Sequence, residues 1–147
     1  MLVRRERVVP AAPAEVWRVV SDPSRLAAWW PGVSRVEEAT PEAWTTVLVS
    51  PGGKSVRADY SLVDSDEPER VLWRHEVEES PFERLLLEST TEIALAPDDG
   101  GGTVVRIALQ QRPRGWARFS PFQLRAAARR QADAALEGLA DLLGDED

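Results

Sequence analysis

Six strand-like runs follow one another through the middle of the chain, and this succession constrains the fold more than any other feature. The runs occupy residues 33–39, 43–50, 54–65, 70–78, 83–95 and 103–112. Turn-forming prolines, glycines and aspartates separate them, as at Thr40-Pro41 and in the glycine triplet at 100–102. Because consecutive strands joined by short turns pair with one another, the runs predict an antiparallel meander.

Alternating polarity indicates which side of the meander meets a core. In strands with one buried face, successive side chains point to opposite sides of the sheet. We predict that the inward residues are Val56, Ala58, Tyr60 and Leu62 in one run and Leu85, Leu87, Ser89, Thr91, Ile93 and Leu95 in another. The intervening residues, such as Arg57 and Glu92, are polar and are predicted to face water.

The N-terminal segment predicts one strand and two short helices. Residues 2–9 are β-branched at both ends and polar between, which is typical of a strand. Pro13 suits the first position of a helix over residues 13–20. A second helix is predicted over residues 23–30, with its N-terminal cap supplied by Ser21 or Asp22.

The last third predicts one long helix. Residues 121–144 are rich in alanine, leucine, arginine and glutamate, which are strong helix formers. The predicted stripe comprises Phe122, Ala126, Arg129, Asp133, Leu136, Leu139, Ala140 and Leu143, broadened by Leu124, Ala128, Ala135 and Leu142. Gly138 is a weak point in this helix, and residues 114–120 predict a separate helical turn before it.

The elements together predict an α+β fold. A seven-stranded antiparallel sheet with one apolar face must bury that face, and the long C-terminal helix is the one large cover available. The predicted architecture is therefore a curved seven-stranded sheet wrapped around the C-terminal helix, with two short helices between strands 1 and 2. Such a sheet can leave a cavity between itself and the helix.

Composition limits the chemistry available to the chain. It has no cysteine and one histidine, so thiolate and multi-histidine metal sites are excluded, and we expect no metal or cofactor. The net charge of −7 is unfavourable for nucleic acid. No apolar run reaches the roughly 20 residues that span a bilayer, and the N-terminus lacks the features of a signal peptide. We expect a cytoplasmic monomer or homodimer without an integral membrane segment.

The stretch from Val9 to Val33 follows the pattern V-P-A-x-P-x-x-V-W-x-x-V-S-D-P-x-x-x-x-x-W-W-P-G-V. Together with the order of elements, it resembles the SRPBCC or START-like superfamily, whose helix-grip fold is also seen in the birch-pollen allergen. The chain looks most similar to its polyketide cyclase/dehydrase-like group. The resemblance implies that residues 1–147 form a single domain that holds a hydrophobic ligand between the sheet and the C-terminal helix. It transfers no catalytic motif.

Two adjacent tryptophans close the second short helix. Leu26, Trp29 and Trp30 share one helical face, but neighbouring residues lie about 100° apart. We expect at least one indole ring in the core. Either both rings are structural, or one of them contacts a ligand at the rim of the cavity, and Trp30 is the candidate for that contact.

The single histidine belongs to a strand whose other residues on that face are apolar. Period two puts Trp73 and His75 on one side, and an imidazole there could act as a general acid or base. The alternative is a histidine that is hydrogen-bonded within the wall. Tyr60 is the other catalytic candidate.

Further polar residues are predicted to face inward at Tyr60, Ser89, Thr91 and Gln111. Each could form a hydrogen bond with a ligand hydroxyl or carbonyl, or with the protein itself. Only convergence of these side chains on one space would favour ligand binding. Phe122, with Trp116 and Phe119, is predicted to close the cavity. The predicted ligand-binding set is Trp30, Tyr60, Trp73, His75, Ser89, Thr91, Gln111 and Phe122.

Three functions fit these features. The first is binding of a small hydrophobic or aromatic ligand in the cavity. The second is a polyketide cyclase/dehydrase-like enzyme acting on a poly-carbonyl or aromatic substrate, in which His75 or Tyr60 moves protons. The third is a lipid-binding or protein-partner module that uses the arginines and aromatics of residues 112–130.

Overall fold

The helices and strands follow the predicted order. The computed structural model describes residues 1–50 and 52–144, and only the backbone at residues 116 and 117. The elements are β1 (Leu2–Val9), α1 (Pro13–Val20), η1 (Pro23–Arg25), α2 (Leu26–Trp29), β2 (Val33–Glu37), β3 (Ala43–Val49), β4 (Ser55–Asp66), β5 (Arg70–His75), β6 (Leu86–Pro97), β7 (Thr103–Pro113), η2 (Gly115–Phe119) and α3 (Pro121–Gly144).

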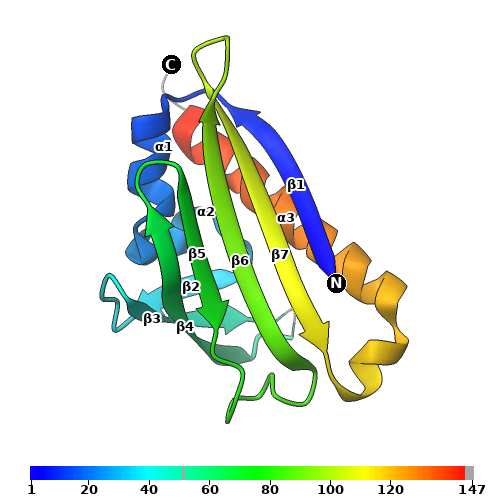
Figure 1. The fold of residues 1–147 in the computed structure, drawn as a ribbon. Coiled ribbons are helices and arrows are strands. Elements are labelled where there is room, and N and C mark those ends of the chain that lie inside the picture. Colours follow the sequence, from blue (N-terminus) through cyan, green and yellow to red (C-terminus); the bar gives the residue numbers. More distant parts are fainter. Residues whose placement is uncertain (51, 145–147) are drawn as a thin grey trace.

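The strands form one antiparallel sheet in the order β1-β7-β6-β5-β4-β3-β2. The meander runs from β2 to β7, and β1 pairs along the free edge of β7, with Val3 opposite Leu109. Figure 1 shows the sheet curving around α3, while α1 and α2 lie at one end of the curve. The predicted α+β, helix-grip architecture is confirmed.

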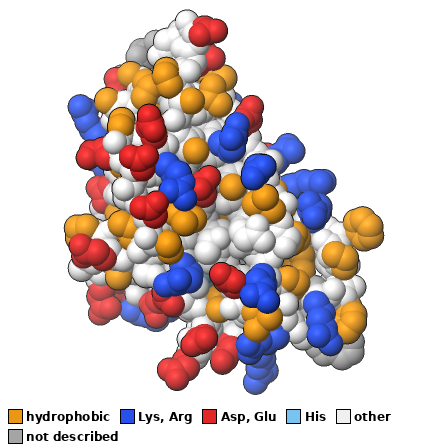
Figure 2. All heavy atoms as spheres, in the orientation of Figure 1, with side chains coloured by type: hydrophobic (Ala, Val, Ile, Leu, Met, Phe, Trp, Pro, Cys, Tyr) orange, Lys and Arg blue, Asp and Glu red, His pale blue; other side chains and the backbone are white. Residues whose placement is uncertain are grey.

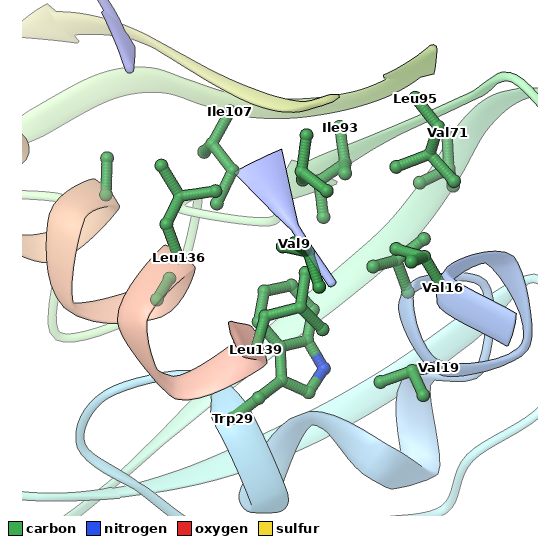
Figure 3. Close-up of a cluster of buried hydrophobic side chains, with 14 of the residues drawn as sticks. Val9, Val16, Val19, Trp29, Val71, Ile93, Leu95, Ile107, Leu136 and Leu139 are labelled. Carbon is green, nitrogen blue, oxygen red and sulfur yellow. The ribbon is translucent and has the colours of Figure 1, made fainter. Parts of the chain in front are cut away.

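The core lies between the concave face of the sheet and the helices. Ile93 of β6 and Ile107 of β7 are fully buried, as are Val16 of α1 and Leu139 of α3 (Figure 3). Burying each such side chain contributes about 1.5–3 kcal/mol. The buried face of α3 also carries small alanines, at 128, 132 and 135, which allow the helix to lie close to its neighbours.

The helix α3 touches α2 at Gly138. A Cβ atom built there would lie 2.4 Å from the carbonyl oxygen of Trp29, so no side chain fits between the two backbones. This residue is a weak point in terms of helix propensity, but glycine is what allows the two helices to touch.

Three expectations about local structure are wrong in detail. The second short helix is split into η1 and α2, with Asp22 capping η1 by accepting a hydrogen bond from the backbone N–H of Ser24. In α3 the buried face runs through Ala132 and Leu136, whereas Arg129 and Asp133 are exposed. Asp133 lies outward because its carboxylate forms an ion pair with a β1 arginine.

The third correction concerns β5 and β6. β5 ends at His75 instead of residue 78, and β6 begins at Leu86 instead of residue 83. Leu85 and Leu87, both predicted to be inward, are 52% and 43% exposed. A register shift between Leu86 and Glu88 interrupts the alternation, so Leu86 takes the inward position in their place.

Candidate functional site

A cavity of about 140 Å³ lies inside the curve of the sheet. The strands from β2 to β7 form most of its wall, and α2, the loop after β5 and α3 close it. It is lined by Leu26, Trp30, Val33, Trp44, Thr46, Leu48, Tyr60, Trp73, His75, Phe82, Leu86, Ser89, Thr91, Leu109, Gln111 and Gln131. None of these lining residues carries a formal charge at neutral pH when His75 is neutral.

One side of the cavity is a row of stacked rings on three neighbouring strands. Trp44 of β3 is the register partner of Tyr60 of β4, which in turn is the partner of His75 of β5. The rings of Trp44 and Tyr60 lie 6.0 Å apart and nearly parallel, at 6°. Tyr60 and His75 stack at 4.8 Å. The antiparallel register therefore places three aromatic rings in one row along the wall of the cavity.

Edge-to-face contacts extend this surface. Trp73 meets the rings of Trp44 at 5.7 Å and Trp30 at 6.0 Å, and Phe82 meets His75 at 4.7 Å. Trp29 touches Trp30 at 5.4 Å but is only 3% exposed and belongs to the core (Figure 3). The adjacent tryptophans thus have different positions, one in the core and one at the cavity wall, as their helical spacing predicts.

Neutral polar side chains form the other side of the cavity. Ser89 of β6 and Gln111 of β7 are register partners, and Thr91 lies two residues further along β6. Gln131 reaches the same cavity from α3. Hydroxyl and amide groups thus converge on one space, which the sequence could not show.

Burial sets the protonation state of the two titratable groups in the wall. It raises the pKa of Tyr60 to about 12, so the phenol keeps its proton and can donate a hydrogen bond. It lowers the pKa of His75, although the nearby charges of Asp59 and Glu76 act in the opposite direction. The imidazole is therefore neutral at pH 7.

Two buried nitrogens in the aromatic row lack hydrogen-bond partners among the described residues. They are Nε1 of Trp44 and Nε2 of His75, and Nε1 of Trp29 in the core shares this state. A neutral imidazole with an unpaired ring nitrogen can accept or donate one hydrogen bond, depending on its tautomer.

Seven of the eight predicted ligand-binding residues line the cavity, namely Trp30, Tyr60, Trp73, His75, Ser89, Thr91 and Gln111. Phe122 does not: it is 87% exposed, because the first turns of α3 precede the part of the helix that packs on the sheet. Phe119 is also exposed, so the prediction that both close the cavity is wrong. The side chain of Trp116 lies outside the described part of the structure.

Sequence reasoning missed three prominent lining residues. Trp44 lies in a run without clear alternation, because residues 44–47 are buried on both faces of β3. Phe82 belongs to a polar loop, and its aromatic side chain was the one sequence feature there that indicated contact with the cavity. Gln131 was missed because the predicted apolar stripe did not coincide with the buried face of α3. This residue lies between Ala128 and Ala135 on that face.

No group of three or more histidine, cysteine, aspartate or glutamate residues in the described part of the chain is arranged to hold a metal ion. Among the described helices, none is both long and apolar enough to cross a membrane.

Solved structures share this fold at low sequence identity. TTHA0849 from Thermus thermophilus is 21% identical, with 99% of this chain and 98% of that chain covered and a TM-score of 0.79. A START superfamily protein from Mycobacterium smegmatis is 11% identical, with 98% and 97% covered and a TM-score of 0.80. The di-domain ARO/CYC protein StfQ from the steffimycin biosynthetic pathway is 13% identical, with 98% of this chain and 50% of that chain covered and a TM-score of 0.77.

The family assignment comes from the sequence itself. No functionally curated protein matches the chain. The family model described as "Polyketide cyclase / dehydrase and lipid transport" matches residues 2–144, which is nearly the whole chain. The solved structures share the fold over nearly the whole of this chain. The chain belongs to the polyketide cyclase/dehydrase and lipid transport family.

Proposed function

We propose that residues 1–147 act as one ligand-binding domain that holds a small aromatic molecule in the cavity. The observation that carries this proposal is the convergence of aromatic rings and neutral polar groups on one cavity. Binding sites for small molecules have this composition, with a mostly apolar lining and a few polar groups that fix orientation.

The expected affinity follows from the surface that one ring buries. An aromatic ring of side-chain size buries about 150–250 Å², which at about 25 cal/mol per Å² gives ~4–6 kcal/mol. The loss of translational and rotational freedom on binding offsets part of this. Because 4–6 kcal/mol corresponds to about 1 mM to 40 μM before that loss, we expect dissociation constants of about 0.1 mM or weaker for ligands of this size.

Thermal unfolding with added hydrophobic compounds tests the proposal. At ten times its dissociation constant, a ligand should stabilise the protein by about 1.4 kcal/mol. Toluene, anisole and acetophenone are suitable single-ring probes. Ser89→Phe should fill the cavity and abolish the stabilisation, while Thr90→Phe, which adds the same ring on the opposite face of β6, should preserve it. Equal responses of the two variants would refute binding in the cavity.

An enzyme of the polyketide cyclase/dehydrase kind is the second candidate. The neutral imidazole of His75 could accept a proton, and the hydroxyl of Tyr60, its stacking partner, could donate a hydrogen bond to a carbonyl. This candidate ranks second because a folded poly-carbonyl chain needs more than about 140 Å³. Ring closure of such a chain, followed by absorbance, should slow in Tyr60→Phe if the enzyme hypothesis holds.

A lipid- or partner-binding surface is the third candidate. Phe119 and Phe122 are exposed in a segment that is rich in arginine from Arg112 to Arg130. Figure 2 shows lysine and arginine side chains beside hydrophobic ones at the lower right, where η2 and the start of α3 lie in Figure 1. Salt-sensitive sedimentation with phosphatidylserine vesicles would support this role, and its loss in Phe122→Ser would place the contact.

A further inference from the structure

We infer that the cavity selects an uncharged molecule about the size of one ring, whose oxygen acceptor faces the polar side formed by Ser89, Gln111 and Gln131. This inference rests on the proposed function and narrows it to a ligand class. Neutral aryl ketones, aldehydes and phenols belong to that class. Carboxylates, amines and fused polycycles do not.

Volume sets the size limit. The cavity of about 140 Å³ is close to the ~150 Å³ of an engineered apolar cavity that accepts benzene, whereas pockets for drug-sized ligands measure ~300–1,000 Å³. A neighbouring hollow of about 30 Å³ shares Leu26, Trp44 and Trp73 with it. Even if these side chains moved apart and joined the two spaces, the gain would be about that of one or two water molecules.

The lining excludes a charged ligand. It contains no lysine, arginine, aspartate or glutamate among its described residues. Transfer of a carboxylate or ammonium group into such an environment is strongly unfavourable, because the neutral lining offers no opposite charge to offset the lost hydration. His75 could not supply a positive charge to pair with a carboxylate. Burial lowers the pKa of His75 and therefore disfavours the imidazolium form.

The polar side supplies hydrogen-bond donors for a ligand oxygen. The amide groups of Gln111 and Gln131 each carry two N–H donors, and the hydroxyl of Ser89 adds another. Ser89 and Gln111 are directly opposite across β6 and β7, so their side chains reach the same point. On the far side, the stacked row of Trp44, Tyr60 and His75 offers ring edges, against which a ligand ring can pack edge to face. A ligand with a ring at one end and an oxygen at the other satisfies both sides.

A matched set of four probes tests the size, the charge and the oxygen separately. Acetophenone is the neutral single-ring ketone, α-methylstyrene replaces its oxygen by a methylene group, benzoate adds a charge at similar size, and 9-fluorenone keeps the ketone on three fused rings. Binding is followed by NMR of the indole N–H signals, because Trp30, Trp44 and Trp73 line the cavity and Trp17 does not. Single tryptophan-to-phenylalanine variants assign these signals.

The expected order is specific. Acetophenone should bind about fivefold more tightly than α-methylstyrene, which is the effect of one neutral hydrogen bond. Benzoate and 9-fluorenone should not saturate the cavity. Gln111→Leu should remove the preference for the ketone while leaving α-methylstyrene binding intact. Gln110→Leu, the same change one residue along β7 on the exposed face, should keep the preference.

The outcomes separate this inference from the proposed function. If 9-fluorenone or α-methylstyrene shifts the cavity tryptophans as strongly as acetophenone does, the ligand class is wrong and cavity binding stands. Tight binding of benzoate would likewise overturn the inference alone. If no probe shifts Trp30 or Trp73, both the inference and the proposed function fail. A ketone preference that survives in Gln111→Leu would refute the role of the polar side.

Discussion

Replacement of Gly138 by alanine is expected to destabilise the protein, although the same change in an ordinary helix stabilises it. The added Cβ would lie 2.4 Å from the carbonyl oxygen of Trp29 and 3.2 Å from its carbonyl carbon. An ordinary contact begins at about 3.4 Å, so α2 and α3 must separate by about 1 Å. Both contacts are with backbone, which cannot rotate away as a side chain can.

Two opposing terms decide the sign. Alanine improves helix propensity over glycine by about 1 kcal/mol. Overpacking of a close contact costs about 1–3 kcal/mol, and the backbone clash puts Gly138 in the upper part of that range. We expect a net loss of about 1–2 kcal/mol in the free energy of unfolding. For a chain of this size, each kcal/mol corresponds to a fall of about 2–4 °C in Tm.

Urea unfolding followed by circular dichroism measures this difference. The neighbouring exposed position provides the control, because the difference between Glu137→Ala and Glu137→Gly gives the propensity term in the same turn of helix. Separation of α2 from α3 should also displace Trp30, and with it the cavity wall. A Gly138→Ala variant that is more stable than the wild type would refute the close contact between the two helices.

Three further predictions concern the cavity and its flanks. Because burial lowers the pKa of His75 from its ordinary value of 6.5, the unfolded chain takes up this proton first. Stability should therefore fall as the pH drops below about 6.5, and in urea unfolding His75→Gln should show a shallower fall. The only tyrosine, Tyr60, should resist ionisation near pH 10 in an ultraviolet absorbance titration while the fold persists, and its phenolate should form nearer 12. Stability is then lost as the pH rises above about 10. Leu86→Ala should cost about 1–2 kcal/mol and Leu87→Ala less than about 0.5, with equal effects contradicting the register shift.

The fold could be predicted from the sequence because its signals are repeated and local. Six strand-like runs and their turn residues specify a meander, and Pro13 and Asp22 mark the helix starts that the structure contains. The errors occur where tertiary contacts override a local pattern. Leu85 and Leu87 follow period two, but the irregularity at Leu86 changes which side faces inward.

The site could be predicted in part, for a related reason. Tyr60, His75 and Thr91 were identified because strand alternation alone assigns them to the inner face. Whether inward polar groups on neighbouring strands meet depends on how those strands are aligned. The alternation of side chains within a single strand does not specify that register. The pairing of Ser89 with Gln111 therefore had to come from the structure. Whether Gln131 faces the cavity depends on the rotation of α3 about its axis. The predicted helical stripe was wrong by one position and therefore omitted this residue.

Nuclear Overhauser effects between acetophenone and the protein are the most direct test of binding in the cavity. We expect contacts from the ring protons of acetophenone to the indole protons of Trp30, Trp44 and Trp73, which form the aromatic side of the cavity. Contacts confined to the exposed rings of Phe119 and Phe122, or no contacts at saturating ligand, would contradict it.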